Sequence, residues 1–227
     1  MRVAEGAGAP DTLAANMPSI EGDRALQRLG FFSDAVFAVA LTLLVIHIPI
    51  PASYVTSDVL HDSLGDVVPE LIGFGLSFAV IGLLWLDHHR LFDHLRRRDE
   101  GLLWANLAFL LCIAFLPYPA GVLTKHLGAP VAVLFFIGSV VVTTLVWLAL
   151  GWYASAGSRL VDESTGEDRR HVLRRSLTTP LVFTLSAPLA PVVFEIGGDE
   201  FSLAIVVWLV ALPAARAAAV RRPASRM

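Results

Sequence analysis

The sequence is short of charge and of cysteine. Only 16% of its 227 residues are charged, whereas soluble domains contain about 25%. A soluble single domain is therefore not expected. The single cysteine, Cys112, has no partner for a disulfide within the chain, which excludes a disulfide-stabilised scaffold. The net charge of −3 offers no basic face of the kind that a nucleic-acid partner requires.

The sequence also lacks the motifs of common enzymes. It contains no Gly-x-Ser-x-Gly elbow and no Gly-x-x-x-x-Gly-Lys phosphate loop. His88 and His89 are adjacent, with His94 nearby, but the remaining histidines are scattered singly rather than in the separated clusters of a membrane metal centre. We expect no enzyme activity, no cofactor and no metal site. The two halves of the chain show no internal repeat, as an inverted-repeat transporter would.

Long apolar segments dominate what is present. Hydrophobic residues make up 56% of the chain, and a helix that crosses a bilayer needs about 20 of them in succession. Six segments are candidates: Phe31–Ile48, Pro69–Asp87, Leu102–Leu123, Pro130–Tyr153, Leu177–Ile196 and Phe201–Ala215, the last with an Ala-rich extension past Arg216. The fifth contains three prolines, so a re-entrant segment is the alternative there. The sequence predicts an all-α integral membrane protein with six transmembrane helices.

Basic residues fall on one side of this arrangement. All but one of the 17 Lys and Arg residues lie before the first span, after the second, after the fourth or after the sixth; the exception is Lys125. Because cytoplasmic loops collect Lys and Arg, we expect a multi-pass protein of the plasma membrane with both termini in the cytoplasm. Residues 1–23 lack the apolar core of a signal peptide and are expected to form a disordered cytoplasmic tail. Residues 24–220 form the predicted six-helix transmembrane domain, and 221–227 a cytoplasmic tail.

The first span has two distinct sides. At about 100° per residue, Leu43 and Ile46 lie within about 40° of Val39, and Thr42 within about 60°. Asp34 lies about 140° from Val39, and Ser33 about 120°. An apolar stripe alone would also fit simple lipid or bundle contact. A carboxylate inside a membrane span is costly, however, and indicates a functional site by default.

One motif in this span is specific. Arg28-x-x-x-Phe32-Ser33-Asp34, followed by Ala-Val-Phe-Ala-Val-Ala-Leu-Thr-Leu-Leu, resembles the signature of the transmembrane-protein-175 family of potassium channels. The resemblance is to the bacterial form, with one six-helix unit per chain. It extends to Trp85, His88 and His89 at the end of the second span, and to Asn106 and Phe115–Pro119 in the third.

The resemblance implies a homotetramer in which four copies of the first helix line a central pore. Members of the family lack the Thr-Val-Gly-Tyr-Gly filter of ordinary potassium channels, and this sequence contains no such loop. The family's constriction falls on Val39, with Leu43 and Ile46 as the next apolar layers and Thr42 as the pore threonine that contributes to ion selectivity. Relatives usually have Ile or Leu at the position of Val39, so either Val39 or Leu43 could be the narrowest point.

The same resemblance implies a network that packs or gates the first helix. It would join Ser33 and Asp34 to Trp85, Asn106 and one of the two adjacent histidines, His88 or His89. Arg28, which is not on the same face as Asp34, would pair with a carboxylate of another helix or subunit, and Phe32 completes the motif. Anchoring of Trp and His at the membrane interface is the alternative.

The function implied is passive, potassium-selective cation conduction through a hydrophobic constriction in the first helix. Its partners would be the lipid bilayer, potassium ions and further copies of the chain. A small proton-coupled secondary transporter that uses Asp34 is the alternative, and a non-conducting membrane scaffold is a third possibility.

Overall fold

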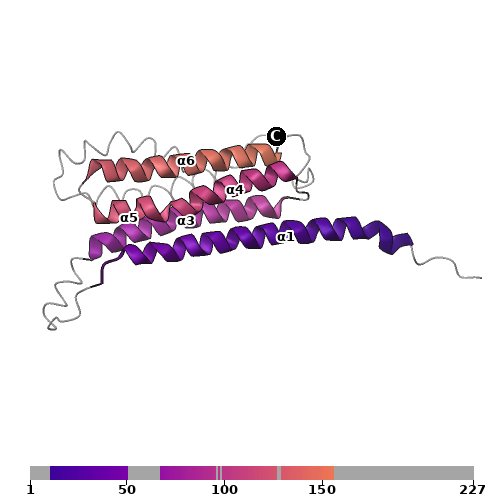
Figure 1. Ribbon diagram of the computed structural model, residues 1–227, viewed down its shortest axis with the longest axis horizontal. Coiled ribbons are helices and arrows are strands. Elements are labelled where there is room, and N and C mark those ends of the chain that lie inside the picture. Colours follow the sequence, from indigo (N-terminus) through magenta and orange to yellow (C-terminus); the bar gives the residue numbers. More distant parts are fainter. Residues whose placement is uncertain (1–10, 51–66, 96, 98, 127–128, 156–227) are drawn as a thin grey trace, which may run out of the picture.

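Long helices running side by side make up the part of the chain that the structure describes (Figure 1). The structure is a computed structural model, and it describes residues 11–50, 67–95, 97, 99–126 and 129–155. Its elements are α1 (Asp11–Leu43), the 3₁₀ helix η1 (Leu44–His47), α3 (Val68–Asp93), α4 (Glu100–Phe115), α5 (Pro117–Lys125) and α6 (Pro130–Ser155). Every one of these elements is helical, so the predicted all-α class is confirmed.

Four stretches of these helices are long and apolar enough to cross a membrane. They are Arg24–His47, Glu70–Asp93, Glu100–Lys125 and Pro130–Ala154. They correspond in order to the first four predicted spans. The predicted fifth and sixth spans lie outside the described residues.

The helix α1 extends beyond the first predicted span at its N-terminal end. It begins at Asp11, and the expected cytoplasmic tail over residues 1–23 stays a prediction. Extending a helix that has already formed fixes one residue at a time at little cost. Residues 11–30 contain Ala, Leu, Met, Gln and Arg, which all have high helix propensity.

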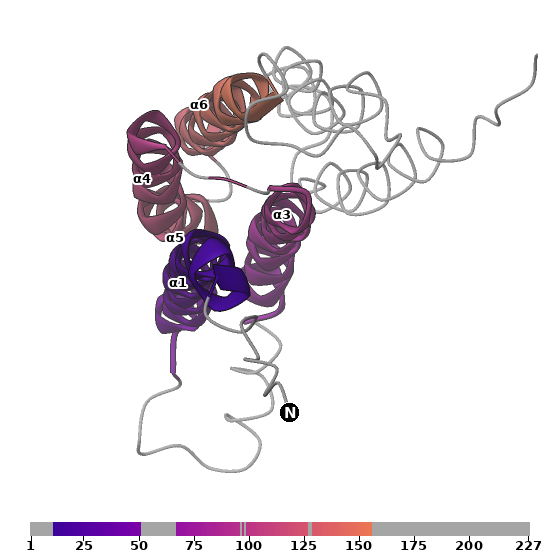
Figure 2. The ribbon, with the colours of Figure 1, turned by 90° about the vertical axis from the view of Figure 1, so that its right-hand side faces the viewer.

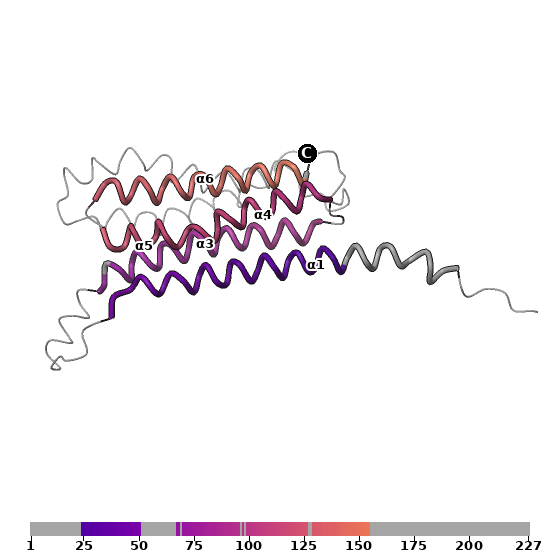
Figure 3. Tube along the Cα trace, in the orientation of Figure 1, coloured from indigo at the N-terminus to yellow at the C-terminus, as the bar shows by residue number. Residues whose placement is uncertain are grey.

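The third span is a broken helix. α4 ends at Phe115 and α5 begins at Pro117, and Figure 3 follows the trace through the junction. Neither Pro117 nor Pro119 has a backbone N–H, so each removes a hydrogen bond that a continuous helix would make. The chain restarts around the buried Leu116, whose carbonyl oxygen accepts from Ala120 N at 3.1 Å. The predicted span Leu102–Leu123 therefore contains two helices instead of one.

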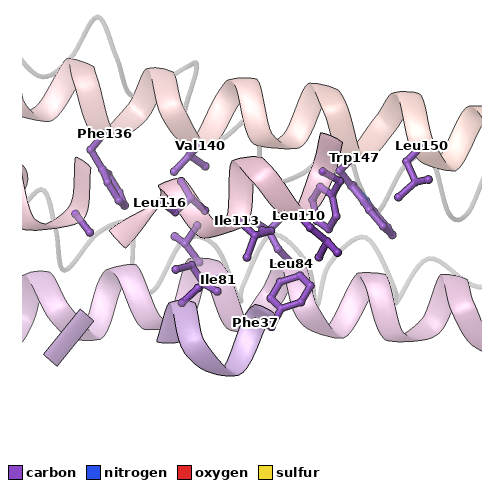
Figure 4. Packing of buried hydrophobic residues seen from close by; sticks show 14 of the residues in the cluster. Phe37, Ile81, Leu84, Leu110, Ile113, Leu116, Phe136, Val140, Trp147 and Leu150 are labelled. Atoms are coloured by element: carbon purple, nitrogen blue, oxygen red, sulfur yellow. The ribbon is translucent and has the colours of Figure 1, made fainter. Parts of the chain in front are cut away.

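Buried aliphatic and aromatic side chains fill the centre of the bundle (Figure 4). The core includes Phe37 of α1, Leu84 of α3, Ile113 of α4 and Trp147 of α6. Inside a bilayer the tails of lipids are as apolar as these side chains, so close packing, rather than removal from water, holds the helices together.

α1 lies at the edge of this bundle. Seen along the helices, it sits beside α3 and the α4–α5 pair, and α6 lies on the far side (Figure 2). One side of α1 is therefore covered by α3, α4 and α5, and none of the described helices covers the other side.

One carboxylate holds the start of α4 and the end of α6 together. Asp99 caps α4, because its Oδ1 accepts from Leu102 N at 2.8 Å, while its Oδ2 accepts from the Tyr153 hydroxyl at 2.8 Å. A Cβ atom on Gly101 would overlap with the Tyr153 ring and hydroxyl. Glycine at position 101 therefore permits this contact.

Candidate functional site

The two sides of α1 that the sequence predicts have opposite environments. Ser33, Phe37, Ala40 and Leu44 are buried against the subunit. Val39, Thr42, Leu43 and Ile46 are exposed. The candidate site therefore consists of an open apolar face and a buried polar network behind it.

The buried side of α1 is held by a directional chain of hydrogen bonds. His88 Nε2 lies 2.9 Å from Asn106 Oδ1, Asn106 Nδ2 donates to Ser33 Oγ at 3.0 Å, and Ser33 Oγ donates to the Leu29 carbonyl at 2.9 Å. Because the Asn106 oxygen can only accept, His88 must carry its proton on Nε2 to donate. The chain joins α3, α4 and α1 in one path. His88, Asn106 and Ser33 are all fully or almost fully buried.

A second contact fixes the carboxylate next to Ser33. Trp85 Nε1 donates to Asp34 Oδ1 at 2.9 Å. The Trp85 ring also stacks on His89, with 5.5 Å between the ring centroids. His89 itself is exposed and lies 3.9 Å from Asp93, one turn further along α3. Of the two adjacent histidines, His88 is the one that reaches Asn106.

Aromatic rings surround His88, and sequence reasoning did not identify them. Phe92 stacks on the imidazole at 4.2 Å between centroids, and Phe37, Phe109 and Trp147 lie at 5.6, 5.7 and 6.1 Å. Of these four aromatic residues, Trp147 is the one whose burial the sequence could have indicated. Tryptophan normally gathers at the ends of spans, whereas Trp147 lies well inside Pro130–Ala154.

The open face of α1 is apolar apart from one hydroxyl. Val39 is 57% exposed, Leu43 39% and Ile46 71%. Ile46 belongs to η1, where the helix tightens before the extended residue Ile48 and Pro49. At about 1.5 Å per residue, Val39 to Ile46 covers about 10 Å along the helix.

Thr42 lies between these apolar residues, and its hydroxyl has a defined direction. Thr42 Oγ1 donates its proton to the Val39 carbonyl at 2.9 Å. A hydroxyl has one proton and two lone pairs, so the lone pairs of Oγ1 are left to accept. Among Val39, Thr42, Leu43 and Ile46, Thr42 is thus the residue with a polar side chain, and its oxygen can accept.

The other two residues of the motif lie on the open side. Arg28 and Phe32 are both exposed. The ion pairs recorded among the described residues join Arg90 to Asp87 and His89 to Asp93. A pairing of Arg28 with a carboxylate of the same subunit is thus not among them.

Together, these features define a multi-pass helical membrane protein whose first span presents an apolar face backed by buried hydrogen bonds. Residues 28–117 match the sequence model of the family described as endosomal/lysosomal potassium channel TMEM175. A protein of Streptomyces collinus named as a potassium channel is 31% identical over 180 residues, which cover 75% of this chain and 87% of the relative. The chain therefore belongs to the TMEM175 family.

Two further comparisons agree with this assignment. A protein of Chamaesiphon minutus named as a potassium channel is 34% identical over 149 residues, which cover 64% of this chain and 72% of the relative. The crystal structure of a lysosomal potassium-selective channel TMEM175 homolog from Chamaesiphon minutus superposes with a TM-score of 0.62 at 27% identity. That match covers 86% of this chain and 98% of the other.

Proposed function

We propose that this protein is a potassium-selective channel that conducts passively through a pore lined by α1. Four copies of the chain surround the pore in a homotetramer, and residues 24–220 form a six-helix channel domain. The observation that carries the proposal is the uncovered apolar face of α1, opposite a side fixed by hydrogen bonds. The choice of potassium as the permeant ion is supported by the relatives that are named as potassium channels.

In the tetramer the four copies share the open face of α1. Val39 and Ile46 are more than half exposed, which leaves them available to line a pore between the copies. Asp34, by contrast, points away from that face and accepts from Trp85. This favours conduction along the apolar face over a transporter that carries protons on Asp34.

The constriction acts through hydration. A ring of four Val39 side chains offers a passing ion no oxygen, and loss of polar contacts without replacement costs several kcal/mol. Since about 1.4 kcal/mol changes a rate tenfold, such a ring can limit conductance and can close by dewetting. Leu43 and Ile46 extend the apolar segment, so a narrow Val39 ring is not the sole barrier.

Thr42 supplies oxygen between the apolar layers. In a tetramer four Oγ1 atoms would face the pore with their protons turned to the Val39 carbonyls. Their lone pairs would replace part of the water lost by the ion. This assigns selectivity to Thr42 and the barrier to the apolar residues around it.

The network behind α1 keeps this face turned outward. His88, Asn106, Ser33, Trp85 and Asp34 link α1 to α3 and α4, so a rotation of α1 would break them together. We assign them a packing or gating role, with Arg28 pairing between subunits. The protein lies in the plasma membrane with both termini in the cytoplasm, as the distribution of Arg supports.

Potassium flux through purified protein in liposomes tests the proposal. We expect a flux that follows the potassium gradient, and a higher flux in Val39→Asn, because an amide can hydrate the constriction. Leu44→Ala is the matched control: Leu44 is a buried apolar residue of the neighbouring turn, and its truncation should lower stability without changing flux per tetramer.

The outcomes separate the alternatives. A higher flux in Leu43→Asn, with Val39→Asn unchanged, would move the barrier one turn along α1. A reversal potential that shifts with pH in a fixed ratio would indicate a coupled transporter instead. An assembled protein without flux in any variant would leave a scaffold and refute the channel.

A further inference from the structure

The end of the first span is held by a contact that does not belong to the hydrogen-bond network. The network meets α1 at Ser33 and Asp34, and His47 lies about 20 Å further along the helix. There the imidazole ring of His47 lies against the backbone of Gly121 in α5. An ideal Cβ atom on Gly121 would overlap with three atoms of this ring, so the contact depends on glycine at that position.

The fit of the ring, rather than a hydrogen bond, makes the His47–Gly121 contact. Nδ1 of His47 is buried and has no hydrogen-bond partner among the described residues. Burial of a polar atom without a partner lowers stability, so Nδ1 does not explain why the ring lies there. Gly121 is buried as well. The contact therefore rests on a flat ring packed on a residue without a side chain.

The 3₁₀ helix η1 connects this contact to the open face of α1. A 3₁₀ helix has three residues per turn, so residues three apart lie in line along it. Leu44, which is 2% exposed, and the half-buried His47 therefore share the covered side. Leu43 and Ile46, which are 39% and 71% exposed, share the open side. Fixing the ring of His47 thus also fixes the direction of Ile46.

Different halves of the broken third span hold the two ends of the first span. The hydrogen-bond network reaches α1 from α3 and α4, whereas the His47 ring lies on α5, beyond the break at Leu116. α5 in turn packs closely on α3, because a Cβ atom on Gly73 would overlap with the side chain of Thr124, one turn from Gly121. The orientation of η1 is therefore set by α5 and not by the network.

We propose that His47 is a positioning residue of the channel, which sets the direction of Ile46 through the fit of its ring against Gly121. Ile46 then completes the apolar segment of the pore at the end of the first span. Without the ring, η1 loses its contact with α5, and Ile46 can turn out of the pore and let water into that layer. This inference rests on the proposed function, in which Ile46 faces the pore.

Two substitutions at position 47 test the role of the ring. His47→Ala removes the ring, and we expect a several-fold higher potassium flux per tetramer in liposomes. His47→Phe keeps a flat ring without nitrogen atoms, so its flux should equal that of the wild type. His126→Ala is the matched control, because His126 is an exposed histidine that directly follows α5, and its flux should not change. Wild-type flux in His47→Ala, or a raised flux in His47→Phe, would overturn the inference.

A disulfide between positions 47 and 121 provides a second test if His47→Ala fails to fold. The Cγ atom of His47 lies 2.8 Å from an ideal Cβ atom on Gly121. The two Cβ atoms are therefore at most about 4.3 Å apart, within the range of about 3.5–4.5 Å that a disulfide requires. The test variant combines His47→Cys and Gly121→Cys with Cys112→Ala, which removes the native thiol.

The oxidised variant should conduct as the wild type does, because the disulfide replaces the His47–Gly121 contact. Reduction in the same liposomes should raise its flux several-fold. Thiol labelling measures how much disulfide has formed, and a disulfide that does not form would contradict the contact itself. Equal flux before and after reduction would refute the positioning role of His47. A wild type without potassium flux would refute the proposed function instead.

Discussion

The buried chain from His88 to Leu29 gives the sharpest test of how α1 is held. Asn106 is the central link, because it accepts from His88 at 2.9 Å and donates to Ser33 at 3.0 Å. Asn106→Leu removes both hydrogen bonds and replaces the amide with a side chain of similar size. We expect the protein to fold and to be less stable.

The loss of stability in Asn106→Leu depends on the polar groups that lose their hydrogen-bond partner. His88 would keep a buried N–H without an acceptor, which costs about 1–3 kcal/mol. Ser33 keeps its bond to Leu29 and loses only the one it accepts, and such a bond in a membrane protein contributes about 0.6 kcal/mol. The sum is about 2–4 kcal/mol, or a fall in Tm of roughly 5–15 °C for a chain of this length.

Thermal unfolding in detergent, followed by the loss of the monodisperse protein, measures this shift. Ser139→Ala is the control, because Ser139 donates only to the Phe135 carbonyl of its own helix and should shift Tm little. A double mutant with Ser33→Ala should be less unstable than the two single changes added together. Additive effects, or a shift no larger than that of Ser139→Ala, would show that the chain of bonds does not hold α1.

Three further substitutions probe the contacts and the open face of the first span, Arg24–His47. Trp85→Phe keeps an aromatic ring and removes the donor to Asp34, so the free energy of unfolding should fall by about 1.5–3 kcal/mol, measured by thermal unfolding. Gly121→Val places a Cβ where the His47 ring lies, and the overlap reaches back to the ring's Cγ atom, so the whole ring would have to move and we expect a marked loss of folded protein on size-exclusion chromatography. Thr42→Val removes four hydroxyl oxygens from the pore and should lower the preference for potassium over sodium in reversal-potential measurements.

Each of these three substitutions has a matched control substitution elsewhere in the chain. Trp104→Phe alters a tryptophan that is mostly exposed on α4. Gly82→Val fills a position with nothing within 4 Å of the added Cβ. Thr143→Val removes a hydroxyl that, like that of Thr42, donates within its own helix. If any of the three controls behaves as its test variant does, the corresponding argument fails.

Two features of the fold could be predicted from the sequence because they depend on long repeats. Four spans were visible as apolar segments of bilayer length. The two sides of the first span were visible because a 3.6-residue period separates Ser33 from Val39 by about 120°. Both predictions rest on a pattern that many residues share, so a single residue that departs from the pattern does not change them.

Features set by single contacts were harder to predict. His88 and His89 are neighbours in sequence, and the resemblance left open which one meets Asn106. The choice follows from the buried side of α3, where Leu84, His88 and Leu91 recur at steps of four and three. Pro117 was a hint of the helix break at Leu116. Prolines are tolerated in membrane helices, however, so Pro117 alone did not show whether the third span is one helix or two.

The double role of Asp99 restricts which changes of length the chain accepts. Both of its carboxylate oxygens are engaged, one by the first turn of α4 and one by the last turn of α6. An insertion or deletion of one residue between Asp99 and Leu102 would turn α4 by about 100° relative to the cap. The tie to Tyr153 would then be lost together with the cap. Natural length variation at this end of the bundle should therefore be confined to the connection before Asp99.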